Sequence, residues 1–242
     1  MNLVNYLISE ITWQELLLFL FLSGGPTLFW LLLCLRLDRS APEPRFQIFK
    51  TFLLGVMITI PLIFVAGYLT NLVEKSSYIS GVTSILILSF LVDGLLEESA
   101  KYGILRQYIV KSLYFDELRD GFIYGMVLGL GFAFVENILY GMITSNIGQG
   151  SSTILLRGFT TTLLHFLTGG IIGYYLGLAK FSKDKVSKRK EYFIAFQGIF
   201  LAVSLHGLYN TIVRFGWWWN LIPLFLLLLI TYLVILAKIR RI

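Results

Sequence analysis

The sequence predicts an all-α, polytopic bundle of about seven transmembrane helices. Hydrophobic residues make up 57% of the 242 residues and charged residues only 14%, and a soluble domain of this length cannot bury that much apolar surface in one core. A hydrocarbon layer about 30 Å thick is crossed by about 20 apolar residues per helix, which leaves room for about seven spans and short loops. We therefore expect a single integral domain over residues 1–242, surrounded by the lipid bilayer.

Apolar windows and the breaks between them define the individual spans in order. Each window is expected to be a helix, because lipid offers no hydrogen-bond partner to an exposed backbone, and no segment alternates as a barrel strand does. The predicted spans cover residues 15–35, 51–73, 82–105, 121–143, 153–179, 192–213 and 217–237.

The lysines and arginines predict the orientation of the bundle. Sixteen of the 20 follow the first, third, fifth and seventh spans, whereas the opposite loops contain only Lys75 and Arg214, and Lys101 and Arg157 lie within spans. The positive-inside rule then places the N-terminus outside and the C-terminus in the cytoplasm. The net charge of +6 reflects this topology, so we exclude nucleic acid as a partner.

Several ionisable side chains lie inside the predicted spans, where each costs at least about 2.5–3.5 kcal/mol to insert. They are Asp93, Glu97, Glu98, Lys101, Glu136, His165 and His206. Such groups normally face a protein interior or a wet cavity. One of them alone is often a hydrogen-bonded helix clamp, but three glutamates and both histidines together provide the parts of a catalytic or metal site.

The helical spacing of these groups predicts that they face one another. Small residues recur every four positions beside Glu136, His165 and His206, and such stripes let membrane helices pack closely. The stripes are Gly121, Gly125, Gly129 and Ala133; Gly169, Gly173 and Gly177; and Gly198 and Ala202, which continue to His206 and Asn210. Four helices are thus expected to converge on one polar centre.

The third span carries four of the charged residues. Asp93, Glu97 and Lys101 share a face at four-residue steps, with Glu98 about 100° around the helix. Lys101 is expected to set the charge balance of Glu97 and Glu98, and Asp93 either lines the site or takes part directly. Counting about 1.5 Å per residue puts Glu98 at a different depth from His206, so the third helix should be longer, tilted or displaced outward.

Four motifs occur in order between residues 93 and 210. Glu97-Glu98-Ser99-Ala100-Lys101 resembles the E-E-x-x-K motif of the PrsW family of intramembrane proteases, and Phe132 to Asn137 resembles its F-x-x-x-E-N motif. His165 matches a lone histidine motif, and His206 with Asn210 is similar to H-x-x-x-N. The resemblance also extends to the larger group that contains the type II CAAX prenyl endopeptidases.

The resemblance implies an endopeptidase in the cell membrane of a bacterium or an archaeon. Its partner would be a membrane-anchored protein substrate, for which the family's role is the site-1-type, extracytoplasmic cut of an anti-sigma factor. The residues that the resemblance assigns to catalysis are Glu97, Glu98, Glu136, His165, His206 and Asn210.

Two mechanisms are open. In the first, Glu97 or Glu98 activates water, while a histidine and Asn210 polarise the scissile carbonyl. In the second, zinc is bound by His165, His206 and one glutamate, for which we take Glu136. We prefer the metal-free version and commit to no cofactor, because the sequence lacks two histidines on one helical turn with a glutamate between them.

Two other classes of protein place similar residues inside a membrane. A proton-coupled transporter or channel does so, although the chain shows no internal repeat of the transporter kind. A noncatalytic membrane scaffold of related fold is the other alternative, and the presence of every motif glutamate and histidine argues against it. We expect a protease whose cavity opens towards the outer face.

Overall fold

The computed structural model describes residues 11–37, 42–144, 146–182, 187–216 and 221–239, and every regular element within these ranges is helical. Five helical runs are long and apolar enough to cross a membrane. They are α2 (Trp13–Leu37), α3 (Arg45–Lys75), α6 (Leu118–Met142), α7 (Ile147–Phe159) together with α8 (Thr161–Ser182), and α9 (Lys188–Arg214). An all-α fold with several membrane spans is therefore confirmed.

The third predicted span forms one continuous helical run with two π-helical parts. It consists of α4 (Gly81–Leu86), η1 (Ile87–Leu95), α5 (Leu96–Ile104) and η2 (Leu105–Ile109). The run extends beyond the predicted 82–105, in agreement with the expectation of a longer third helix. The last helix is α10 (Leu221–Ile239), and the predicted start of its span at residue 217 lies outside the described residues.

The prediction of one uninterrupted helix over residues 153–179 is wrong. The helix breaks at Thr160, whose φ of −106° and ψ of −67° depart from helical values. The Thr160 hydroxyl donates to the carbonyl oxygen of Leu156 at 2.9 Å, and threonines that bond back in this way bend helices. Before the break, α7 packs against α2 and α6, and Arg157 of α7 forms an ion pair with Glu136.

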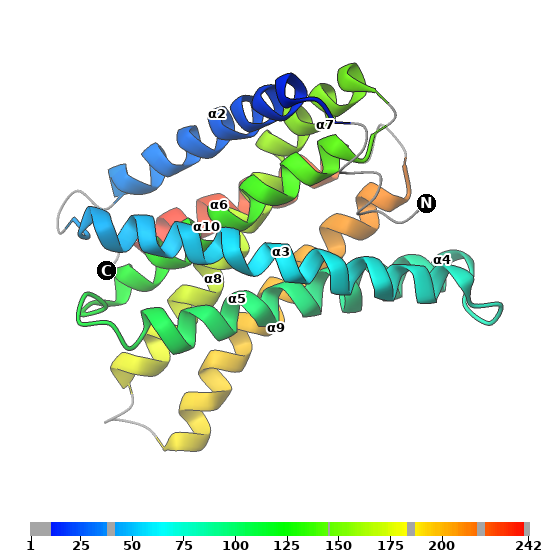
Figure 1. The fold of residues 1–242 in the computed structure, drawn as a ribbon. Coiled ribbons are helices and arrows are strands. Elements are labelled where there is room, and N and C mark those ends of the chain that lie inside the picture. The colour runs from blue at the N-terminus through cyan, green and yellow to red at the C-terminus, as the bar shows by residue number, and fades with distance from the viewer. Residues whose placement is uncertain (1–10, 38–41, 145, 183–186, 217–220, 240–242) are drawn as a thin grey trace.

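The glycine stripes of α6 and α8 face each other. A Cβ added to Gly121, Gly125 or Gly129 would lie 2.2, 2.1 or 2.0 Å from the carbonyl oxygen of Gly173, Gly169 or His165, respectively. The two backbones therefore touch without side chains between them. Figure 1 shows α6 and α8 in the middle of the bundle, and this contact fixes the height of His165 relative to Glu136.

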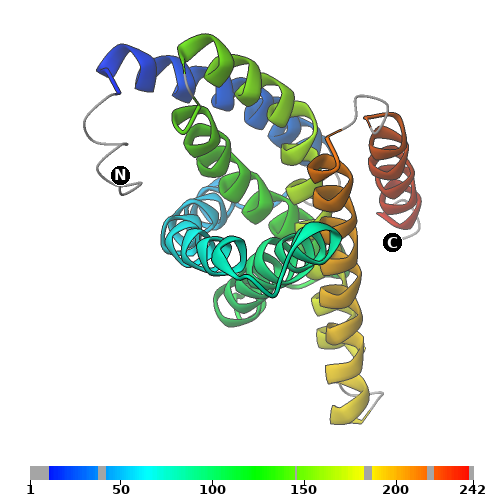
Figure 2. The ribbon, with the colours of Figure 1, turned by 90° about the vertical axis from the view of Figure 1, so that its right-hand side faces the viewer.

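The remaining helices surround this pair. In Figure 1, α3 and the run from α4 to α5 cross the front, and α2 with α7 lies along the top. Figure 2 looks onto the end at which α3 passes into α4 and shows α10 at the edge of the bundle beside α9.

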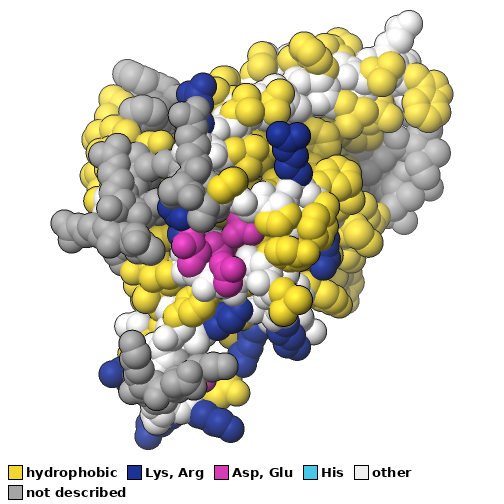
Figure 3. Space-filling view, turned by 90° about the vertical axis from the view of Figure 1, so that its left-hand side faces the viewer, with side chains coloured by type: hydrophobic (Ala, Val, Ile, Leu, Met, Phe, Trp, Pro, Cys, Tyr) yellow, Lys and Arg dark blue, Asp and Glu magenta, His cyan; other side chains and the backbone are white. Residues whose placement is uncertain are grey.

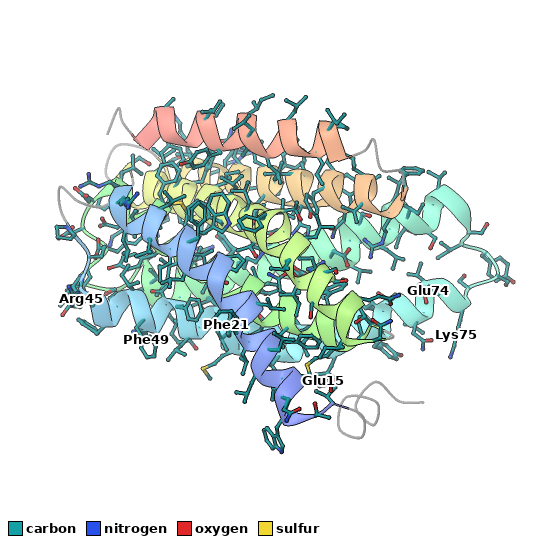
Figure 4. All side chains as sticks on the ribbon, turned by 90° about the horizontal axis from the view of Figure 1, so that it is seen from above. Glu15, Phe21, Arg45, Phe49, Glu74 and Lys75 are labelled. Carbon is teal, nitrogen blue, oxygen red and sulfur yellow. The ribbon has the colours of Figure 1, made fainter. Side chains whose placement is uncertain are left out.

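The two ends of the bundle differ in charge. Figure 3 shows the end that carries the α2–α3 and α5–α6 connections, where Lys and Arg side chains surround a central group of Asp and Glu. Figure 4 shows Arg45 and Phe49 at this end of α3, and Glu74 and Lys75 at its other end.

Candidate active site

Six of the predicted residues meet in one buried polar network between four helices. Glu97, Glu98 and Lys101 come from α5, Glu136 from α6, His165 from α8 and His206 from α9. None of the six is more than 8% exposed. The predicted convergence of four helices on a polar centre is thus what the structure shows.

Glu98 lies at the centre of the network. Its Oε1 accepts from Lys101 Nζ at 2.8 Å, from His206 Nδ1 at 2.6 Å and from Thr168 Oγ1 at 3.2 Å. A carboxylate that binds Nδ1 leaves the lone pair of the neutral imidazole on Nε2. His206 Nε2 lies 4.0 Å from Glu97 Oε2, so Glu98 orients His206 towards Glu97.

Lys101 and His165 continue the network to α6. Lys101 Nζ lies 2.7 Å from His165 Nδ1, and His165 Nε2 lies 2.8 Å from Glu136 Oε2. Because an ammonium group only donates, Nδ1 must accept and Nε2–H must donate to Glu136. Lys101 therefore pairs with Glu98 and also sets the tautomer of His165.

Arg157 is a member of the site to which the sequence analysis assigned no role. Its guanidinium forms an ion pair with Glu136 at 2.8 Å, donates to Asn137 Oδ1 at 3.1 Å and stacks 3.7 Å from the centre of the Tyr140 ring. Its position within a predicted span already indicates a place in a polar site, since an arginine inside a membrane requires a polar or charged partner. Arg157 holds the Glu136 carboxylate in place.

Asp93 and Asn210 form a separate group at one side of the site. Asp93 Oδ2 accepts from Asn210 Nδ2 at 2.7 Å and from Arg214 at 2.5 Å. Asn210 is therefore engaged by Asp93 and not by a catalytic glutamate or histidine. The shared face of Asp93, Glu97 and Lys101 stays a prediction, and the helical run that carries them is π-helical from Ile87 to Leu95.

Two hollows approach the network from the end of the bundle that carries Lys75 and Arg214. The first, of about 310 Å³, lies between α3 and α6 and is lined by Glu97 and Glu136; we call it the α3–α6 cleft. The second, of about 500 Å³, lies between α7, α8, α9 and α10 and is lined by Arg157 and Asn210 but by neither glutamate. Asp93, Tyr140 and Arg214 line both.

Three of the buried residues form a group that can hold a metal ion. One ligand atom from each of Glu97, His165 and His206 lies within 4.8 Å of the other two. Two observations fit such an ion. Glu97 Oε2 has no hydrogen-bond partner among the described residues, and the Glu98–His206 bond is the arrangement that supports metal-binding histidines.

The glutamate in this group is Glu97, where the sequence analysis had taken Glu136. The Glu136 carboxylate is engaged by Arg157 and His165, each at 2.8 Å. His165 would exchange its Glu136 bond for the ion, since Lys101 occupies its other ring nitrogen. The set of two histidines and one glutamate leaves a fourth position open for water or substrate, as catalytic zinc sites do.

Comparison with known proteins gives a consistent result. Residues 43–238 match the model of the family described as PrsW family intramembrane metalloprotease. The chain is 35% identical to Protease PrsW of Bacillus subtilis over 190 residues, which are 77% of this chain and 79% of that protein. It is 32% identical to Protease PrsW of Clostridioides difficile over 203 residues, or 84% and 80% of the two chains. No solved structure gives a significant match.

The comparisons bear on two earlier expectations. The description of the family as metalloproteases counts against the metal-free version of the mechanism. The similar proteins are bacterial, so they support a bacterial membrane and give no support to an archaeal one.

Proposed function

The chain belongs to the PrsW family of intramembrane metalloproteases. From this premise we propose that it hydrolyses a peptide bond of a single-span membrane protein, with Glu97 as the central catalytic residue. One observation carries the proposal. Glu97 Oε2 is buried and has no hydrogen-bond partner among the described residues, yet Glu97 lines the α3–α6 cleft and lies 4.0 Å from His206 Nε2. A free carboxylate at the end of a cleft is poised to act on water.

Glu97 and the residues around it have separate roles in the proposed reaction. Glu97 accepts a proton from the attacking water and passes it to the leaving amine. Glu98 holds His206 with Nε2 towards Glu97, and Lys101 neutralises Glu98 within the protein interior. Arg157 and His165 fix Glu136 beside the same cleft, where Glu136 can position the water.

A metal ion fits this arrangement and would be held by Glu97, His165 and His206. When bound, it would polarise the scissile carbonyl and make water acidic enough to attack at neutral pH. Glu97 is required in either version, as the base or as a ligand. The rival readings as a transporter or a scaffold have no comparable support, because the matched family is a protease family.

The proposal is tested by reconstituting the purified protein into lipid vesicles with a panel of single-span membrane proteins, including one of the anti-sigma-factor type. We expect the wild-type protein to cut at least one of them near its outer membrane boundary, and empty vesicles to cut none. A panel that stays intact under conditions in which the reconstituted protein is folded would contradict the proposal.

Metal analysis separates the two versions of the mechanism. We expect about one divalent transition-metal ion per chain in the wild-type protein, and a loss of both the metal and the activity in His206→Ala. Asn210→Ala should keep the metal, because Asn210 is bonded to Asp93. Full activity of wild-type protein that contains no metal would restore the metal-free mechanism.

The same proposal includes the topology. We propose seven crossings, formed by the five spanning runs together with the run from α4 to η2 and α10, with the N-terminus outside and the C-terminus in the cytoplasm. The end of α3 at Glu74 and Lys75 is then external, and so is the opening of both hollows. The basic end in Figure 3 is then cytoplasmic, as the positive-inside rule requires.

Cysteine labelling tests this orientation with two exposed positions on one helix. In a Cys34→Ser background, Glu74→Cys should react with an impermeant thiol reagent added outside intact cells, and Lys50→Cys should react only after the membrane is permeabilised. Both side chains are exposed near opposite ends of α3. The reverse pattern would invert the topology and the side on which substrate is cut.

A further inference from the structure

Helices α3 and α6 touch in the middle of the bundle and then separate. A Cβ at Gly55 would lie 2.2 Å from Leu128 O, and one at Gly131 would lie 2.1 Å from Phe52 O. The last buried residue of α3 is Leu62, so residues 63–75 of the helix include none that is buried against the protein. This half of α3 is about 20 Å long at 1.5 Å per residue, and it forms one wall of the α3–α6 cleft.

One face of α3 and one end of α6 form most of the lining of the cleft, and Asp93, Glu97 and Arg214 complete it. On α3 the lining positions fall at steps of three and four, and they are small or polar towards the outer end: Ile63, Ala66, Gly67, Thr70, Asn71 and Glu74. The facing wall of α6 follows the same spacing, with Glu136, Leu139, Tyr140 and Ile143. A helix face that contacts only lipid has no need of polar side chains. The peptide groups of an unwound substrate, in contrast, need hydrogen-bond partners within the membrane.

The cleft leads to the reacting groups. Glu97 lines it and is only 8% exposed, and its Oε2 has no hydrogen-bond partner among the described residues. Gly67 lies on the opposite wall, and a Cβ added there would meet no atom within 4 Å. A chain lying between them would thus have room to bring its backbone close to α3 while a peptide bond faces Glu97.

We propose that the outer half of α3 is the docking surface for the substrate, and that the outer end of a substrate's transmembrane segment enters sideways between α3 and α6 and lies unwound along this face. The inference rests on the proposed protease function. Thr70 and Asn71 provide hydrogen-bond partners for peptide groups that unwinding exposes, which the lipid cannot do. The larger hollow near α10 is not this site, because neither Glu97 nor Glu136 lines it.

A tryptophan substitution tests the docking surface with a matched control. Gly67→Trp fills the cleft, whereas Gly25→Trp places the same side chain on an exposed part of α2 where the added Cβ also meets nothing within 4 Å. Using a single-span protein that the wild type cleaves, we expect Gly67→Trp to lower the cleavage rate by about tenfold or more, since small displacements of a substrate have large effects on rate. Gly25→Trp should cleave at close to the wild-type rate.

Photo-crosslinking gives a second readout that does not require turnover. In a Glu97→Gln background, a benzophenone amino acid at Asn71 should form an adduct with the same substrate, and one at its lipid-facing neighbour Leu72, which is 49% exposed, should not. Adducts at Leu72 alone, adducts of Asn71 with phospholipid only, or a Gly67→Trp protein as active as wild type would each overturn the docking surface. A wild-type protein that cleaves nothing would instead overturn the proposed function itself.

Discussion

The Glu97→Gln protein is expected to cleave substrate about 10²–10⁴-fold more slowly than wild type, the range that a positioned general base contributes. The amide keeps the shape of the side chain and loses the group that accepts a proton or binds a metal. Cleavage of a reconstituted single-span substrate measures the effect. The fold should be retained, because Glu97 Oε2 has no hydrogen-bond partner among the described residues.

The control for Glu97→Gln is the same change at Glu15, an exposed carboxylate at the start of α2 that bonds to Thr12. Glu15→Gln should cleave at the wild-type rate. A Glu97→Gln protein that folds and retains full turnover would remove Glu97 from the mechanism in both of its versions.

Lys101→Met is expected to have the largest effect on stability. Lys101 is fully buried and pairs with Glu98 at 2.8 Å, so its removal leaves an uncompensated carboxylate in the interior. Breaking a buried pair from one side typically destabilises a protein by about 3–5 kcal/mol. Denaturant or thermal unfolding of the protein in detergent micelles measures the loss.

Two further variants test the cause of this destabilisation. The double variant Lys101→Met with Glu98→Gln should be more stable than Lys101→Met alone, because neither charge is then left unpaired. Lys75→Met, at the exposed end of α3, should unfold as the wild type does. If Lys101→Met also unfolded as the wild type does, the ammonium would not be compensating Glu98.

Much of the bundle follows from hydropathy and spacing. The apolar windows predicted the helices, and the four-residue repeats of small residues predicted that these helices pack closely, because both signals are local and periodic. The convergence of Glu97, Glu98, Glu136, His165 and His206 could be predicted for the same reason. Glu136, His165 and His206 lie on or beside stripes of small residues, and Glu97 and Glu98 are charged groups within a span, so all of them should face other helices.

The remaining features depend on contacts between distant parts of the chain. The break at Thr160 lies inside a window that hydropathy predicts as a single span, and it is accompanied by the packing of Pro26 against Gly158. The π-helical turns of η1, which carry Asp93, leave no mark on the composition. The choice of Glu97 over Glu136 as a metal ligand depends on Arg157, whose ion pair with Glu136 joins α7 to α6.

The burial of Lys101, Glu98 and Glu97 on one helix has a consequence for how the protein is made. The run from Gly81 to Ile109 is not among the five helical runs apolar enough to cross a membrane by themselves. Lys101 of this run pairs with His165, which lies 64 residues later, and Glu98 pairs with His206, which lies 108 residues later. At about 5–20 residues per second, a ribosome needs roughly 5–20 s to supply the later partner. Until then the charges of the third helix lack these partners, so we expect its stable insertion into the bilayer to be a late step of biogenesis.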